Sequence, residues 1–122
     1  RGLKSVYGIE FERFRPLDVA GPLTVSALKS GKVDCANLFS TQSAIGVNGF
    51  VSLTDPKKLI ASQAIVPLVA KAVATPETTA ALDQVSAKLT TRGVEEMVRR
   101  VEIDKADAAE VAQDFLRAQG LD

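Results

Sequence analysis

Three consecutive polar residues, Ser40, Thr41 and Gln42, stand in a largely apolar stretch of the chain, ANLFSTQSAI at residues 36–45. Hydroxyl and amide side chains hydrogen-bond to polar solutes, and a Ser at a helix start accepts a hydrogen bond from the first helical turn. Two interpretations stay open. In one, Ser40 only caps a helix; in the other, capping is combined with contacts from this segment to a ligand.

A second polar corner contains Asp18 and Gly21, in the segment LDVAGPLT at residues 17–24. Asp favours turns in which its carboxylate accepts hydrogen bonds from nearby backbone amides. The alternative is a polar contact from Asp18 to a ligand, and the residue pattern supports both interpretations equally.

The composition excludes several kinds of chemistry. The 122 residues contain no His, which removes the Ser-His-Asp triad and most zinc sites, so we expect no enzyme, no metal and no cofactor. Fifteen basic and fifteen acidic residues balance, which argues against nucleic-acid binding. The lone Cys35 lies in the apolar run VDCANL, and we expect a buried thiol.

The elements that would position both corners alternate between strands and helices. Residues 12–18, 32–39 (KVDCANLF) and 50–55 (FVSLTD) fit strands. A helix between the first two would begin with Gly21 as N-cap and Pro22 at its first position, and end at Gly31. A short helix capped by Ser40 would follow the second strand. This order predicts an α/β fold with parallel βαβ units, in which both helix starts lie at one sheet edge, where ligands bind.

The second half changes character. QAIVPLVAKAVA, residues 63–74, predicts a return strand that Pro67 confines to an edge or bends. Three helices follow, the first with Thr75 as N-cap and Pro76 at its first position, and the last ended by Gly120. The spacing of apolar residues predicts their buried faces: Leu82, Val85 and Leu89; Val94, Met97, Val98 and Val101; Ala108, Val111, Ala112 and Phe115.

Several blocks resemble, in order and over nearly the whole chain, substrate-binding proteins of ABC importers for osmoprotectants. They are LKSVYGIEFERFRPLD, ALKSGKVDCANLFSTQSAI, FVSLTDPKKL, IVPLVAKAV and the run from VSAKLTT to RAQGL. The resemblance implies a non-enzymatic component that binds glycine betaine, choline, carnitine or a related solute and presents it to a membrane permease. It implies an extracytoplasmic location, in the periplasm or as a cell-surface lipoprotein of a bacterium.

The resemblance also implies part of a type II periplasmic-binding-protein fold, with ligand held in a cleft between two lobes. Residues 1–54 would be the βαβαβ part of the second lobe, 55–63 a crossover or hinge, and 64–122 the return strand and helices of the first lobe. The chain resembles only the C-terminal half of such proteins. We therefore expect exposed apolar surface and a homodimer formed by exchange of elements; a fragment with only a structural or oligomeric role is the alternative.

Six positions are the expected ligand contacts: Asp18, Gly21, Ser40, Thr41, Gln42 and Gln63. Relatives commonly carry an acidic residue where this chain has Gln42. They also tend to have an aromatic residue near Gln63, where this chain has none. Both differences weaken binding of a quaternary ammonium cation and favour a more polar or hydroxylated solute.

Overall fold

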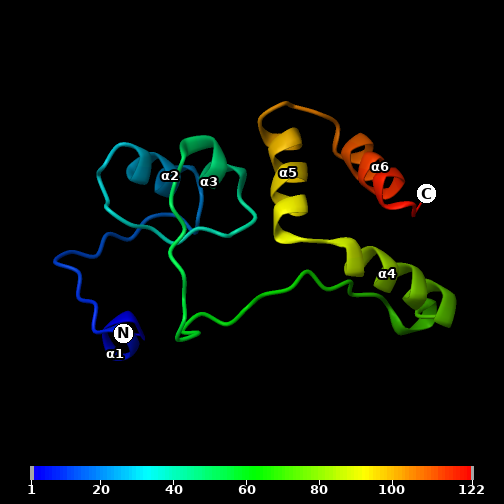
Figure 1. The fold of residues 1–122 in the computed structure, drawn as a ribbon, viewed down its shortest axis with the longest axis horizontal. Helices are drawn as coiled ribbons and strands as arrows, with labels where there is room; N and C mark the ends of the chain where they lie inside the picture. Colours follow the sequence, from blue (N-terminus) through cyan, green and yellow to red (C-terminus); the bar gives the residue numbers. More distant parts are fainter. Residues whose placement is uncertain (1, 122) are drawn as a thin grey trace. The chain divides into compact units, whose positions relative to one another are not determined.

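The computed structural model describes residues 2–121, and every regular element in that range is a helix. The first half contains α1 (Gly2–Tyr7), α2 (Pro22–Lys29) and α3 (Ser43–Asn48). The second half contains a 3₁₀ turn, η1 (Lys71–Val73), and the longer helices α4 (Pro76–Lys88), α5 (Thr91–Glu102) and α6 (Ala108–Gln119). Figure 1 shows these helices joined by coil, with no strand arrow.

The predicted α/β fold is therefore wrong for residues 2–121: no strand and no parallel βαβ lobe of a type II periplasmic-binding-protein fold forms there. The segments 12–18, 32–39, 50–55 and 63–70 are coil. A strand needs ladder hydrogen bonds to a neighbouring strand. Alternation of apolar residues shows that a segment suits a pleated sheet, but it does not show that a partner strand is present. Many of their apolar side chains accordingly face solvent, with Phe14, Leu53 and Leu68 exposed by 86%, 86% and 99%.

The helix α2 follows its local signals. Gly21 is the N-cap and Pro22 occupies the first position, as predicted. At the other end Gly31 adopts a left-handed φ of 68°. The Gly31 amide donates to the Leu28 carbonyl (3.1 Å) and the Lys32 amide donates to the Ala27 carbonyl (2.9 Å), which pairs two of the helix's last carbonyls.

The prediction of Ser40 as the cap of the next helix is wrong, because α3 begins at Ser43. Ser40 and Thr41 form a turn ahead of it. The later start places the buried Ser43 in the first turn of α3, where its hydroxyl donates to the Glu102 carboxylate at 2.6 Å. A contact between residues so far apart in sequence leaves no local signal.

The three predicted helices of the second half are confirmed, and so are the cap predicted for the first and the end predicted for the last. Thr75 caps α4 by accepting from the Thr78 amide (3.2 Å), and Pro76 occupies the first position. Thr90 caps α5 and Asp107 caps α6 through side-chain oxygens that accept from backbone amides. Gly120 ends α6 in the left-handed region, as predicted.

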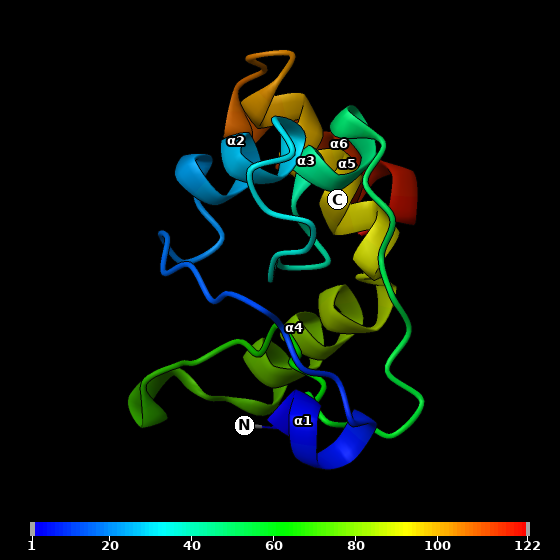
Figure 2. The same ribbon diagram turned by 90° about the vertical axis from the view of Figure 1, so that its left-hand side faces the viewer.

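Burial is slight for a chain with 46% hydrophobic residues: among the described residues, the buried apolar side chains are Ala20, Ala27 and Val111. The helices α5 and α6 lie side by side in Figures 1 and 2, and an ion pair from Arg100 to Asp114 (2.7 Å) joins them. Their predicted apolar faces are only partly covered, since Ala108 and Ala112 are exposed. Cys35 is exposed as well, which corrects the expectation of a buried thiol.

The chain divides into two compact units. The first comprises residues 1–40 and 44–62, and the second comprises residues 41–43 and 63–122. In the range that the structure describes, no helix combines the length and the apolar character needed to span a bilayer.

Candidate functional site

The corner at Asp18 is built around the start of α2. One carboxylate oxygen, Oδ1, accepts from the Thr24 amide (2.8 Å) and from the Thr24 hydroxyl (2.7 Å), and the other, Oδ2, accepts from the Leu23 amide (3.0 Å). These donors, the Thr24 hydroxyl first, hold the pKa of Asp18 below its ordinary value of 3.8. Asp18 is thus ionised at neutral pH and pairs the free amides of the first helical turn.

Gly21 lies against this carboxylate. A Cβ atom placed on Gly21 would come within 2.3 Å of Asp18 Oδ2, far inside van der Waals contact. Only a residue without a side chain leaves room for the carboxylate, so the structure brings Asp18 and Gly21 together as one corner. The Asp18 carboxylate accepts hydrogen bonds from nearby backbone amides, which are the contacts that the turn interpretation expects.

Sequence reasoning did not single out Thr24, the second half of this arrangement. Its side chain is 4% exposed, and the Asp18 backbone carbonyl, 2.8 Å from the Thr24 hydroxyl oxygen, is a second acceptor in reach of the single hydroxyl proton. The signal was present: a Thr three residues after a Gly N-cap stands where a side chain can hydrogen-bond back to the residues before the helix.

The second corner, residues 40–43, is a turn that leads into α3. Ser40 is exposed, whereas Thr41 and Gln42 are half-buried and Ser43 is buried. Ser43 was not among the predicted site residues, yet its hydroxyl donates to the Glu102 carboxylate. Gln63, the sixth predicted contact, is an exposed coil residue at the start of the main part of the second unit.

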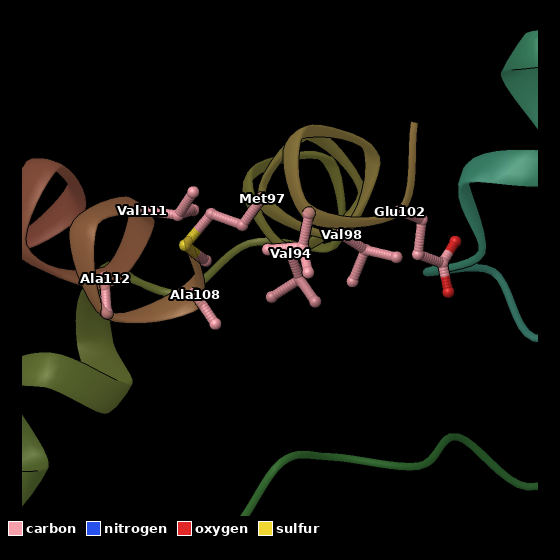
Figure 3. Close-up of a pocket in the computed structure, with 8 residues that line it drawn as sticks. Val94, Met97, Val98, Glu102, Ala108, Val111 and Ala112 are labelled. Atoms are coloured by element: carbon pink, nitrogen blue, oxygen red, sulfur yellow. The ribbon is translucent and has the colours of Figure 1, made fainter. Parts of the chain in front are cut away.

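A hollow of about 370 Å³ lies along α5 and α6 within the second unit. Figure 3 shows Met97 of α5 reaching toward Ala108 and Val111 of α6, with Glu102 at the end away from α6. Its lining is almost wholly aliphatic: Val94, Met97, Val98, Val101, Glu102, Ala108, Val111 and Ala112. Such a lining can bury apolar surface, and it offers a single carboxylate for polar recognition. None of the six predicted contacts lines it.

The comparison with known families decides what kind of protein this is. The family model for the substrate-binding domain of ABC-type glycine betaine transport systems matches residues 1–118. The chain belongs to this family. No solved structure matches the chain.

The glycine betaine transport family is the one that the sequence blocks indicated, so that interpretation is confirmed. A member of this family is a substrate-binding component of a transporter, which acts outside the cytoplasm and works with a solute and a permease. Among residues 2–121, no cluster of acidic and Cys side chains gathers that could hold a metal ion.

Proposed function

We propose that this chain binds a quaternary ammonium osmoprotectant, such as glycine betaine, choline or carnitine, or a related small polar solute, and presents it to the permease of an ABC importer. The family match over residues 1–118 is the observation that carries this proposal. The protein would work in the periplasm, or on the cell surface of a bacterium as a lipoprotein.

The proposed ligand contacts are six: Asp18, Gly21, Ser40, Thr41, Gln42 and Gln63. Asp18 holds the start of α2 in place, and Gly21 leaves room for the Asp18 carboxylate at that corner. Ser40 and Thr41 add hydroxyl groups, and Gln42 and Gln63 add amides. Residues 55–63 are proposed as the crossover between the parts 1–54 and 64–122.

The identity of two of these residues bears on solute preference. Gln42 is neutral, so it contributes no negative charge opposite an ammonium group. The residues next to Gln63 in the sequence include no aromatic ring, so they supply no cation–π partner for an ammonium group. A solute with hydroxyl groups would gain more from this set of side chains than a trimethylammonium group does.

Isothermal titration calorimetry tests the proposal directly. The chain is titrated with glycine betaine, choline, carnitine and a polyol, each in separate runs. We expect saturable heat for at least one of these solutes. Absence of heat for all four refutes the small-molecule function.

Two variants then test the proposed contacts. Thr41→Val keeps the shape of the side chain and removes its hydroxyl, and should weaken affinity by about twofold to tenfold, the value of one hydrogen bond. Thr79→Val, on the exposed surface of α4, is the matched control and should leave affinity unchanged.

Gln42→Glu should strengthen binding of a cation by about twofold to fivefold, whereas Gln84→Glu should not. Equal effects in test and control variants would remove residues 41 and 42 from the site.

The exposed apolar side chains favour a second candidate, a structural or oligomeric module without ligand binding of its own. Leu53, Val66 and Leu68 are 86%, 78% and 99% exposed. Surface of this kind is characteristic of interfaces, and a homodimer formed by exchange of elements would bury it. Sedimentation equilibrium at micromolar concentration distinguishes the candidates: a dimer without calorimetric heat supports the module, and a monomer that binds solute supports the transporter component.

A further inference from the structure

The only tyrosine of the chain, Tyr7, sits at the end of α1 and contacts residues some fifty positions later. Its hydroxyl donates to Asp55 Oδ1 and accepts a hydrogen bond from the Lys57 amide (2.8 Å). A single phenol oxygen therefore pairs with two groups of the same later segment. All three residues belong to the first unit.

The side chain of Lys57 returns to the same helix end. Its Nζ donates to the Val6 carbonyl (2.6 Å) and lies 5.2 Å from the centre of the Tyr7 ring. The last carbonyls of a helix lack partners within the helix, and a cation placed there is favourable. At the other end of α1, the Leu59 side chain packs so closely that a Cβ on Gly2 would come within 2.8 Å of it.

The segment 55–60 is also closed on itself. The second carboxylate oxygen of Asp55 accepts from the Ile60 amide (2.8 Å), and the Asp55 carbonyl accepts from the Lys58 amide (3.0 Å). Lys58 adopts a positive φ of 52°, which costs a non-glycine residue free energy and persists only where surrounding contacts enforce it. The turn at residues 55–60 and α1 thus stabilise each other's position.

The residues that follow this turn differ from it in their hydrogen bonding. Of the described residues, 61–69 make no hydrogen bond through backbone or side chain. The apolar side chains of Ile65 and Leu68 are 61% and 99% exposed, so packing does not hold them either. One of the points at which the chain passes between the two units falls within this stretch, between Ser62 and Gln63. Exposed backbone without hydrogen bonds is where local motion needs least free energy.

We propose that Tyr7, Asp55 and Lys57 form a latch that makes residues 55–60 move as one body with α1, so that the flexible hinge of the chain begins only after Ile60. The first half of the segment 55–63 is then an extension of the first unit, and its second half is the joint. Tyr7 acts as a positioning residue through its hydroxyl. This assignment does not depend on which solute binds.

Amide hydrogen exchange of the whole chain tests the latch. In the unmodified chain, the Lys57, Lys58 and Ile60 amides should exchange slowly and the amides of residues 61–66 quickly. Tyr7→Phe removes only the hydroxyl and should accelerate exchange at Lys57 and Ile60 by about fivefold to tenfold, the effect of one hydrogen bond. The Thr24 amide in α2 should keep its protection.

Ser5→Ala is the matched control. It removes an exposed hydroxyl from the same helix, one that donates only to the Gly2 carbonyl, and should leave exchange at Lys57 and Ile60 unchanged. Asp55→Asn is the second variant and should release the Ile60 amide. The proposal is overturned if residues 57–60 exchange as fast as 61–66 in the unmodified chain, or if Tyr7→Phe changes nothing. Loss of Thr24 protection in Tyr7→Phe and Asp55→Asn alike also overturns it, because the cluster would then hold the whole unit together.

Discussion

Replacing Gly21 by Ala is the sharpest test of the corner at α2. The backbone of Gly21, with φ of −90° and ψ of −170°, suits any residue, so the substitution causes no backbone strain. The whole effect must come from the added methyl group, which would stand 2.3 Å from Asp18 Oδ2 and 2.8 Å from Asp18 Cγ. Because these are not flexible ends of a long side chain, the Asp18 carboxylate has to move away.

The size of the effect follows from what that movement breaks. The carboxylate would lose its hydrogen bonds with the Leu23 amide and the Thr24 amide, which lie at 3.0 and 2.8 Å. Loss of side-chain capping at a helix start typically costs about 0.5–2 kcal/mol. We expect Gly21→Ala to lower the free energy of unfolding by about 1 kcal/mol, and the melting temperature by about 5 °C.

Urea unfolding provides the assay. Tyr7 belongs to the same unit as α2 and the chain has no Trp, so tyrosine fluorescence reports this unit, while circular dichroism follows all helices. Gly93→Ala is the control: its methyl would stand 3.2 Å from Thr90 Oγ1, a contact that a slight shift relieves, and Ala favours a helix by about 1 kcal/mol over Gly. This control should keep or raise stability.

A double variant decides whether the reasoning is right. In an Asp18→Ala background the clashing carboxylate is gone, so the further change Gly21→Ala should cost almost nothing. The two substitutions are therefore expected to be strongly non-additive. An equal cost of Gly21→Ala in both backgrounds would show that the methyl group acts by some other route, and the capping role given to Asp18 would fall.

Three further predictions concern the Tyr7 phenol, the carboxylates of Asp18 and Asp55, and the buried Val111. Desolvation, and after it the hydrogen bond to Asp55, raises the pKa of the Tyr7 phenol above 10. The contribution of this phenol to stability is therefore complete below pH 10 and is lost as the pH rises through the raised pKa. Phenolate absorbance should show this pKa, and Asp55→Asn should move it back toward 10. The pKa values of Asp18 and Asp55 lie below 3.8, chiefly because Asp18 accepts from the Thr24 hydroxyl and Asp55 from the Ile60 amide. The stability that these carboxylates contribute is therefore complete at neutral pH and falls on acidification below pH 3.8. In an acid titration followed by circular dichroism, Asp18→Asn should show a smaller loss of helix signal in this range. Val111→Ala removes two methyl groups from a side chain that is 2% exposed and should cost about 1.5 kcal/mol in thermal unfolding, whereas Val66→Ala, 78% exposed, should cost little; equal costs would contradict the burial of Val111.

The family and the helices α2, α4, α5 and α6 could be predicted from the sequence because both depend on local order, whereas α1 was not predicted and the start of α3 was wrong. Thr75 with Pro76, and Gly21 with Pro22, act within one helical turn, and the observed helix starts follow them. The family blocks likewise are read residue by residue, and their match spans residues 1–118. The six proposed ligand contacts rest on this family likeness, since the sheet edge expected to align both corners is absent from residues 2–121.

What the chain's residues determined by themselves, then, is that α2, α4, α5 and α6 form, where α2 and α4 begin, and which family the protein belongs to. The tertiary structure alone decided that residues 12–18 and 50–55 stay unpaired, that α3 starts at Ser43 beside Glu102, and that Tyr7 meets Asp55. The physical reason is the distance in sequence between the groups that interact. A helix cap or a left-handed glycine interacts with neighbours along the chain, whereas a ladder hydrogen bond, a buried hydroxyl or a phenol–carboxylate pair forms only if a segment distant in sequence lies next to it.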